Sequence, residues 1–201
     1  MKLDPRTDAL VLVDVQNDFC PGGALPVPDG DRVLPVLNTL LRQGGVLAVA
    51  TRDWHPPDHC SFRAQGGPWP VHCVAGTPGA DFHPGLDRGR IAHVVSKATT
   101  QAQEAYSGFQ GTDLADVLRQ RGIRAVFIGG LATDYCVKAT ALGARKAGLD
   151  VFLITDAIRA VNVRPGDGDR AIAEMRAAGV IPLTSADIDL PTSAPPGPSP
   201  R

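Results

Sequence analysis

The stretch 126–137, VFIGGLATDYCV, joins an apolar run to a pair of glycines and, shortly after them, a cysteine. The apolar run predicts a buried β-strand, and the two glycines predict a tight exit from it. Residues that cap helices follow, so we expect a helix from Thr133 or Asp134 through Ala147. This arrangement places Cys136 in the first turn of that helix.

A cysteine at the start of a helix is a candidate nucleophile. Free backbone N–H groups and the positive end of the helix dipole lower the pKa of a thiol at that position, and the thiolate is the form that attacks carbon. Free cysteines are also commonly buried as small apolar side chains. The position of Cys136 alone therefore leaves catalysis and plain packing equally open.

Apolar runs and helical segments alternate along the chain. We expect strands at 9–15, 46–51, 94–96, 125–128, 149–155 and 180–183. Helices are expected at 31–43, 112–121, 133–147 and 167–178. Because the strands are continuous apolar runs, they are typical of a parallel sheet covered on both faces. The predicted fold is α/β, a doubly wound, mainly parallel six-stranded sheet with helices on both faces.

Chain length and two irregular stretches define the domain organisation. A chain of 201 residues is long enough for one well-buried α/β domain and short for two, so we expect a single domain over 1–188. The segment 52–93 lacks either periodicity and is typical of a functional loop, here predicted to bind metal. The segment 189–201 contains five prolines with Ser and Gly and is predicted to be a disordered tail.

The charge balance argues against a nucleic-acid partner. The chain has 20 basic and 21 acidic side chains, and no cluster of Lys and Arg could bind a phosphate backbone. We expect neither a secretory signal nor a membrane span, because charges interrupt the first apolar segments. The four cysteines show no paired framework, which fits reduced thiols in a cytoplasmic protein. The sequence leaves a monomer and a homo-oligomer both open.

Polar residues follow the first four predicted strands, namely Asp14, Asp53, Lys97 and Cys136. Ligands of an open parallel sheet bind outside the carboxyl ends of the strands, so all four residues can face one crevice. A thiol that attacks an amide needs a base for its proton and a donor for the leaving amine. Asp14 can do both, and Lys97 beside it favours the thiolate. Singly, such an Asp often closes a turn and such a Lys is often solvated, but the combination favours catalysis.

The turn before Cys136 also offers donors for an oxyanion. The nearest are the backbone N–H groups of Cys136 and of a residue within 131–133. A nucleotide site is not expected, because no GxGxxG pattern follows a strand and the carboxylates at the strand ends would repel a pyrophosphate.

All five histidines lie between residues 55 and 93. Three imidazoles and a carboxylate suit zinc, iron or manganese, and the candidate ligands are Asp53, His55, His59 and His72. A competing zinc site would use Cys60 and Cys73, although neither has a CxxC partner. The alternative without a metal is a loop whose histidines hydrogen-bond backbone carbonyls. We interpret His83 and His93 as structural.

Aromatic side chains offer flat apolar walls for a small planar ligand. The candidates are Phe19, Trp69 and Tyr106. Each of them, taken singly, is more often plain packing.

Six motifs follow one another along the chain: DVQNDFCPGGALPV, TRDWHPPDHCSF, WPVHCVAGTPGADFHP, AYSGFQGTDLADVL, GGLATDYCVKATALGA and ITDAIRAVN. In this order and spacing they resemble the nicotinamidases of the isochorismatase-like cysteine hydrolase superfamily. The resemblance covers roughly residues 8–183. It implies an amidohydrolase that converts nicotinamide and water to nicotinate and ammonia, also hydrolyses pyrazinamide, and serves NAD salvage.

The same resemblance implies roles for individual residues. It makes a catalytic triad, working through a cysteine thioester, of Asp14, Lys97 and Cys136. It assigns one divalent metal ion, which binds the ring nitrogen of the substrate, to Asp53, His55, His59 and His72. It gives the oxyanion hole to Ala132 and Cys136, with a cis peptide between Leu131 and Ala132. The implied substrate pocket contains Phe19, Trp69, Tyr106 and Leu131.

Two other functions stay open at this level. A different amidase of the superfamily would act on another small amide, but amidases with carbamoyl or ureido substrates generally lack the DWHPPDH and WPVHC motifs, and an isochorismatase would lack the cysteine. A non-catalytic metal-binding or thiol redox protein would explain the cysteines and histidines. It would not explain why Asp14 and Lys97 stand at neighbouring strand ends.

Overall fold

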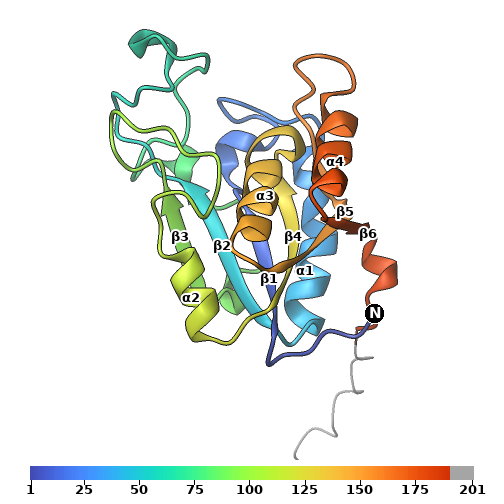
Figure 1. Ribbon diagram of the computed structural model, residues 1–201. Coiled ribbons are helices and arrows are strands. Elements are labelled where there is room, and N and C mark those ends of the chain that lie inside the picture. The colour runs from blue at the N-terminus through green and yellow to red at the C-terminus, as the bar shows by residue number, and fades with distance from the viewer. Residues whose placement is uncertain (191–201) are drawn as a thin grey trace, which may run out of the picture.

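Six strands form one sheet in the order β3-β2-β1-β4-β5-β6 (Figure 1). The computed structural model describes residues 1–190. The strands are β1 (Asp8–Val13), β2 (Leu47–Asp53), β3 (His93–Lys97), β4 (Ala125–Leu131), β5 (Asp150–Arg159) and β6 (Ile181–Leu183). Every neighbouring pair is parallel. The predicted doubly wound α/β fold is therefore confirmed, and the strand order reverses between β1 and β4, where such folds bind their ligands.

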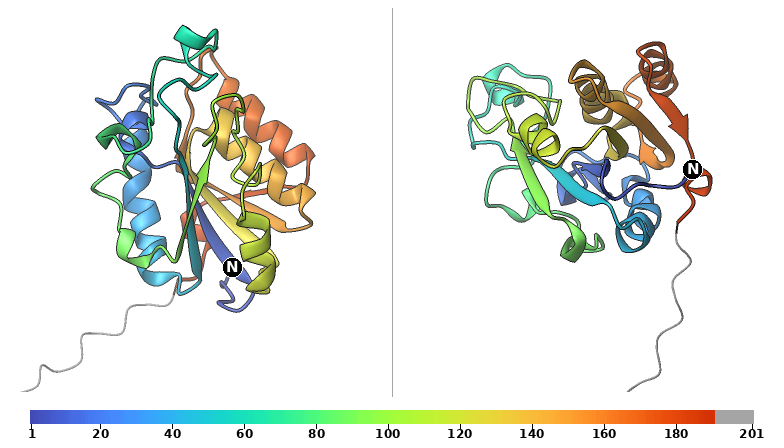
Figure 2. Two further views of the ribbon diagram at one scale, coloured as in Figure 1. Left: turned by 90° about the vertical axis from the view of Figure 1, so that its left-hand side faces the viewer. Right: turned by 60° about the horizontal axis from the view of Figure 1, so that its bottom comes forward.

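Two apolar cores cover the two faces of this sheet. In β1, Leu10 and Leu12 belong to one core, whereas Ala9, Val11 and Val13 belong to the other, because successive side chains of a strand point to opposite faces. One face is covered by α1 (Leu34–Gln43), and the other by α2 (Leu114–Gln120), α3 (Lys138–Lys146) and α4 (Asp167–Ala177) (Figure 2). Burial on both sides explains why the strands are unbroken apolar runs.

The carboxyl end of β4 lies very close to β1. Gly130 has a φ of +123°, and a Cβ atom there would lie 2.1 Å from the backbone oxygen of Val13, so only glycine fits. The register against β5 shifts between Ile128 and Gly130. We expected β5 to end at Thr155, but after this shift it continues to pair with β4 as far as Arg159.

The segment after β4 differs from the expected helix start. Residues Thr133–Val137 form a π-helical turn, and α3 begins only after it. The Asp134 side chain does not cap the helix, because its two oxygens accept N–H bonds from Val161 at 3.0 Å and Asn162 at 2.8 Å. Asp134 thus ties the segment after β5 to the π turn. Cys136 lies in this turn, a type of irregularity that is frequent at functional sites.

The segment between β2 and β3 begins beyond the carboxyl end of β2 and returns beside α1, where Asn38 donates to the Gly85 carbonyl at 2.7 Å, to the start of β3 (Figure 1). Residues 54–92 contain three short 3-10 helices and neither an α-helix nor one of the six strands, in line with their missing periodicity. At the other end of the chain, Asp189 was expected to begin a disordered tail. Its N–H instead donates to the Met1 carbonyl at 2.7 Å. Residues 191–201 of that predicted tail lie outside the described residues.

The described helices are short relative to a bilayer. Within residues 1–190, none is both long and apolar enough to cross a membrane.

Candidate active site

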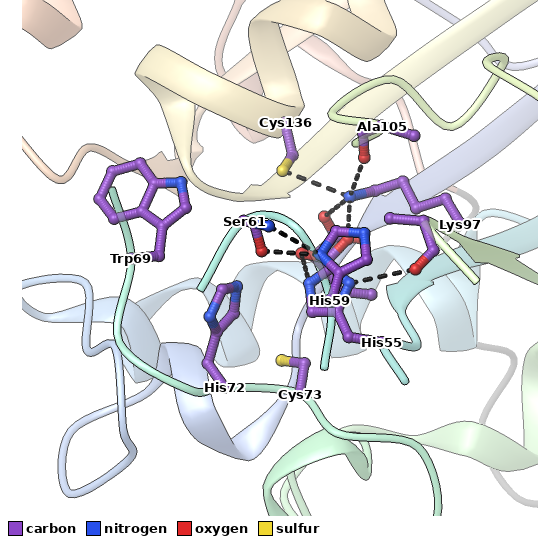
Figure 3. A network of polar contacts seen from close by, with 12 residues as sticks. His55, His59, Ser61, Trp69, His72, Cys73, Lys97, Ala105 and Cys136 are labelled. Carbon is purple, nitrogen blue, oxygen red and sulfur yellow. Dashed lines mark hydrogen bonds and ion pairs between the residues drawn. The ribbon is translucent and has the colours of Figure 1, made fainter. Parts of the chain in front are cut away.

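Lys97 lies at the centre of a buried polar cluster (Figure 3). Its Nζ atom is 2.9 Å from Asp14 Oδ2 and 3.4 Å from Cys136 Sγ. It also donates to Asp53 Oδ1 and, at 3.2 Å, to the Ala105 carbonyl. All of these residues are buried. The structure thus brings together the four polar residues that follow the first four strands.

Asp14 follows β1 with a left-handed backbone, at a φ of +49°. Thr51 Oγ1 donates a hydrogen bond to Asp14 Oδ1 at 2.6 Å. Asp14 Oδ2 forms the ion pair with Lys97, and no other group among the described residues donates a hydrogen bond to this oxygen. A carboxylate oxygen of Asp14 lies within 4.8 Å of the Cys136 sulfur. This carboxylate is therefore placed to exchange a proton with the thiol.

Burial and mutual charge decide the protonation of this cluster. Burial alone would lower the pKa of Lys97, but the carboxylates of Asp14 and Asp53 outweigh it and raise that pKa well above its ordinary value. Burial raises the pKa of Asp14, and Lys97 offsets this only in part. Burial would also raise the pKa of Asp53, but Lys97 and His55 hold it below its usual range. The cluster therefore contains a protonated lysine, an ionised Asp53 and a carboxyl at Asp14 that readily holds a proton.

The pKa of Cys136 does not follow the expectation from its place at a helix start. Burial raises it well above the ordinary value, and the lowering contribution of Lys97 is smaller. The helix-dipole argument failed because the sulfur lies in a buried π turn beside two carboxylates. Cys136 is therefore a thiol that needs a base, as an amide-cleaving nucleophile with a neighbouring Asp14 requires.

The turn that carries Cys136 starts with a cis peptide between Leu131 and Ala132, as predicted. The Ala132 carbonyl accepts the N–H groups of Tyr135 and Val137, both at 3.1 Å. Ala132 and Cys136 line the same cavity, so both residues lie beside any ligand bound there.

A second group, Asp53, His55 and His72, has its ligand atoms within 4.8 Å of one another. His55 Nδ1 contacts the Ala98 carbonyl at 3.1 Å, and His72 Nδ1 contacts the Pro70 carbonyl at 2.8 Å. These bonds assign the proton of each ring to Nδ1 and leave the Nε2 lone pair for a metal. His55 Nε2 is in fact buried without a hydrogen-bond partner. The donor set and this unpartnered nitrogen fit a divalent metal ion.

His59 lies beside this group but outside it. Its ring stacks on His55 with 4.2 Å between ring centroids. Its Nδ1 contacts Ser61 Oγ at 2.8 Å and its Nε2 contacts the Gln103 carbonyl at 3.2 Å, so both ring nitrogens are engaged. The structure therefore joins three of the four predicted metal ligands.

The alternative metal sites find less support. The group of three contains neither Cys60 nor Cys73, and burial raises the pKa of Cys73 well above its ordinary value, which opposes the thiolate that zinc requires. His83 accepts the Gly85 N–H at 3.0 Å, and His93 contacts Asp113 at 3.2 Å. These contacts agree with structural roles for both histidines.

One cavity opens above the two polar groups. Its walls consist of Phe19, Leu25, Val27, Asp53, Trp69, His72, Glu104, Tyr106, Ala132, Tyr135, Cys136 and Val161. Trp69 Nε1 donates to the Tyr106 hydroxyl at 3.0 Å, and Tyr135 packs edge-to-face on Trp69. A flat ring bound between these aromatic side chains would have the Cys136 thiol and the His72 imidazole on its boundary. The predicted pocket residue Leu131 is completely buried in the core and is not among the walls.

Residues 8–187 match the isochorismatase domain family. The chain belongs to this family. It is 43% identical over 209 residues to the nicotinamidase of Escherichia coli (strain K12), with 92% of this chain and 97% of that protein covered. It is 42% identical over 182 residues to the nicotinamidase/pyrazinamidase of Mycobacterium tuberculosis, covering 86% of this chain and 96% of that protein.

Solved structures of the isochorismatase family share the same architecture. The pyrazinamidase of Pyrococcus horikoshii in complex with zinc superposes with a TM-score of 0.84 at 52% identity, covering 88% of this chain and 98% of that chain. PnC1 from L. infantum in complex with nicotinate gives a TM-score of 0.90 at 41% identity, covering 94% and 98%.

Some residues of this isochorismatase-family site were missed by sequence analysis. Gln16 is completely buried, and its amide binds the Asp53 backbone twice at 2.8 Å and the Ala80 carbonyl at 2.9 Å. Five residues that line the cavity were not predicted as part of the site: Leu25, Val27, Glu104, Tyr135 and Val161. A polar residue three positions beyond an apolar strand is a signal for Gln16, and adjacency to Cys136 is one for Tyr135. Nothing in the local pattern distinguishes the others from surface or core residues.

Proposed function

We propose that this isochorismatase-family protein hydrolyses nicotinamide to nicotinate and ammonia through a thioester on Cys136. The observation that carries the proposal is the single ammonium of Lys97 in contact with Asp14 and Cys136 at the base of an aromatic-walled cavity. The nicotinamidase relatives over most of the chain support the same substrate. Pyrazinamide is the expected second substrate, and we assign the reaction to NAD salvage in the cytoplasm.

The first half-reaction transfers the acyl group to sulfur. Asp14 takes the proton of the Cys136 thiol, and Sγ attacks the carboxamide carbon. The backbone N–H groups of Ala132 and Cys136 would stabilise the resulting oxyanion. Asp14 then returns its proton to the amide nitrogen, the carbon–nitrogen bond breaks, and ammonia leaves. The raised pKa of Asp14 suits it to hold this proton between the two transfers.

The second half-reaction hydrolyses the thioester. Asp14 takes a proton from a water molecule, whose oxygen attacks the thioester carbon. The carbon–sulfur bond then breaks, and Asp14 gives that proton to Sγ, which restores the Cys136 thiol and frees the acid. Lys97 stays protonated throughout and keeps the two carboxylates in place, as its raised pKa indicates.

Asp53, His55 and His72 would hold one divalent ion, zinc, iron or manganese, and His59 could join them once its ring leaves Ser61 and Gln103. When bound, the ion would supply a Lewis acid that orients and polarises the ring nitrogen of the substrate. The zinc complex of the Pyrococcus horikoshii relative supports this choice of cofactor.

Ammonia release from nicotinamide by the metal-loaded protein tests the proposal. We expect turnover by the wild type, its loss in Cys136→Ala with the metal content unchanged, and loss on chelation that the metal reverses. Cys20→Ala is the matched control, because Cys20 is also buried but lies outside the cavity walls. Turnover by Cys136→Ala would refute the nucleophile. No turnover by the wild type, with hydrolysis of another small amide, would favour the alternative amidase.

A further inference from the structure

Glu104 is an acidic residue that lines the cavity and does not belong to the Lys97 cluster. Its side chain is half-buried in the same cavity as Cys136 and His72. Its Oε1 accepts the N–H of Ala105 at 2.9 Å, and the Ala105 carbonyl in turn accepts Lys97 at 3.2 Å. The first bond holds one oxygen of the half-buried carboxylate against the backbone, and the second ties that backbone segment to Lys97.

The basic residue among the cavity walls is His72, which the proposed function assigns to the metal. Among the described residues 1–190, neither Lys nor Arg lines this cavity. Lys97 lies beneath it and already contacts the carboxylates of Asp14 and Asp53. A neutral ligand loses nothing by this arrangement, whereas an anionic ligand meets the negative charge of Glu104, which no Lys or Arg of the cavity walls pairs with.

The charge of Glu104 acts on its neighbours across the cavity. Burial is the main reason why the pKa of Tyr106 is raised, and the Glu104 carboxylate adds to that rise. Tyr106 is part of the aromatic wall through its bond with Trp69. A ligand held against this wall would therefore lie within the field of Glu104.

We propose that Glu104 is a specificity-determining residue that weakens binding of anionic ring carboxylates relative to neutral ligands of the same shape. The inference rests on the proposed function, whose substrate is a neutral amide and whose product is the corresponding anion. Repulsion by Glu104 then favours release of the product carboxylate and limits its rebinding.

The test compares two ligands that differ in charge but not in shape, nicotinate and 3-nitropyridine, neither of which is an amide. Their dissociation constants are measured by calorimetry with the full-length, metal-loaded wild type, Glu104→Gln and Glu174→Gln. Glutamine keeps the size of Glu104 and an oxygen to accept the Ala105 N–H. Glu174, on α4, pairs with Lys138 at 3.0 Å and supplies the same substitution away from the cavity.

We expect Glu104→Gln to bind nicotinate about threefold to tenfold more tightly at low salt, with 3-nitropyridine changed less and Glu174→Gln like the wild type. The difference should shrink near 1 M salt, where the screening length is about 3 Å. The inference is overturned if Glu104→Gln changes the dissociation constants of nicotinate and 3-nitropyridine by the same factor, or leaves both unchanged. It is also overturned if none of the proteins binds either ligand. The ammonia assay shows independently whether the proposed function stands.

Discussion

The ends of β1 and β3 and the π turn after β4 place Asp14, Lys97 and Cys136. A segment with neither α-helix nor any of the six strands places His55, His59 and His72. In the first region, parallel pairing fixes which residues meet, because the carboxyl ends of the strands share one edge. In the second, individual bonds from ring nitrogens to carbonyls and a hydroxyl fix each side chain. Strand ends therefore determine the reacting groups, and loop contacts determine which histidines can serve as ligands.

The largest effect is expected from removing the Lys97 ammonium, which contacts the carboxylates of Asp14 and Asp53 at the strand ends. Lys97→Met leaves the carboxylates of Asp14 and Asp53 buried without their cation, so we expect a loss of about 3–5 kcal/mol in the free energy of unfolding, measured by denaturant titration. Ammonia release should be lost as well. Lys138→Met is the control, because its ion pair with Glu174 is partly exposed to solvent and its loss should cost about 1 kcal/mol or less. Equal losses in both variants would contradict the buried cluster.

For the histidines between β2 and β3, the prediction concerns the affinity for the metal ion. His55→Ala removes the unpartnered Nε2 and should weaken metal binding by about 100-fold or more. His59→Ala removes a ring bonded to Ser61 and Gln103, and should weaken it by less than about tenfold. Titration of the metal-free proteins with zinc, followed by calorimetry, measures both constants. If the two variants lose affinity equally, His59 is a full ligand, as the family resemblance implies.

A smaller effect is expected from the bond between Thr51 and Asp14. The hydroxyl of Thr51 stabilises the ionised carboxylate, so its loss in Thr51→Val should raise the pKa of Asp14 further. Because protonated Asp14 cannot accept the thiol proton, kcat/KM should fall as the pH drops through this pKa, and the fall should begin at higher pH in the variant. We expect a shift of about one pH unit or less. The measurement is the pH dependence of kcat/KM with metal-saturated protein. If kcat/KM falls at the same pH in the wild type and in Thr51→Val, protonation of Asp14 does not control the rate.

The same contrast explains how much the sequence could predict. Continuous apolar runs indicated the parallel sheet, and the polar residues at the strand ends indicated the cluster around Lys97, because strand periodicity is local. The prediction that Asp134 could cap the helix was wrong, because its partners Val161 and Asn162 lie 27 and 28 residues away. The engagement of His59 depends on Gln103, 44 residues away, which no local pattern shows. The pKa of Cys136 was misjudged because burial cannot be read from its position alone.

Trapping the acyl group on the protein tests the central claim most directly. Metal-loaded protein is mixed with excess nicotinamide, quenched in acid during turnover, digested and analysed by mass spectrometry. The account predicts a nicotinoyl group on the peptide that contains Cys136, formed and lost at rates compatible with turnover, and absent from Cys136→Ala. Full ammonia release without any such adduct, or an adduct on another cysteine with Cys136→Ala still active, would contradict it.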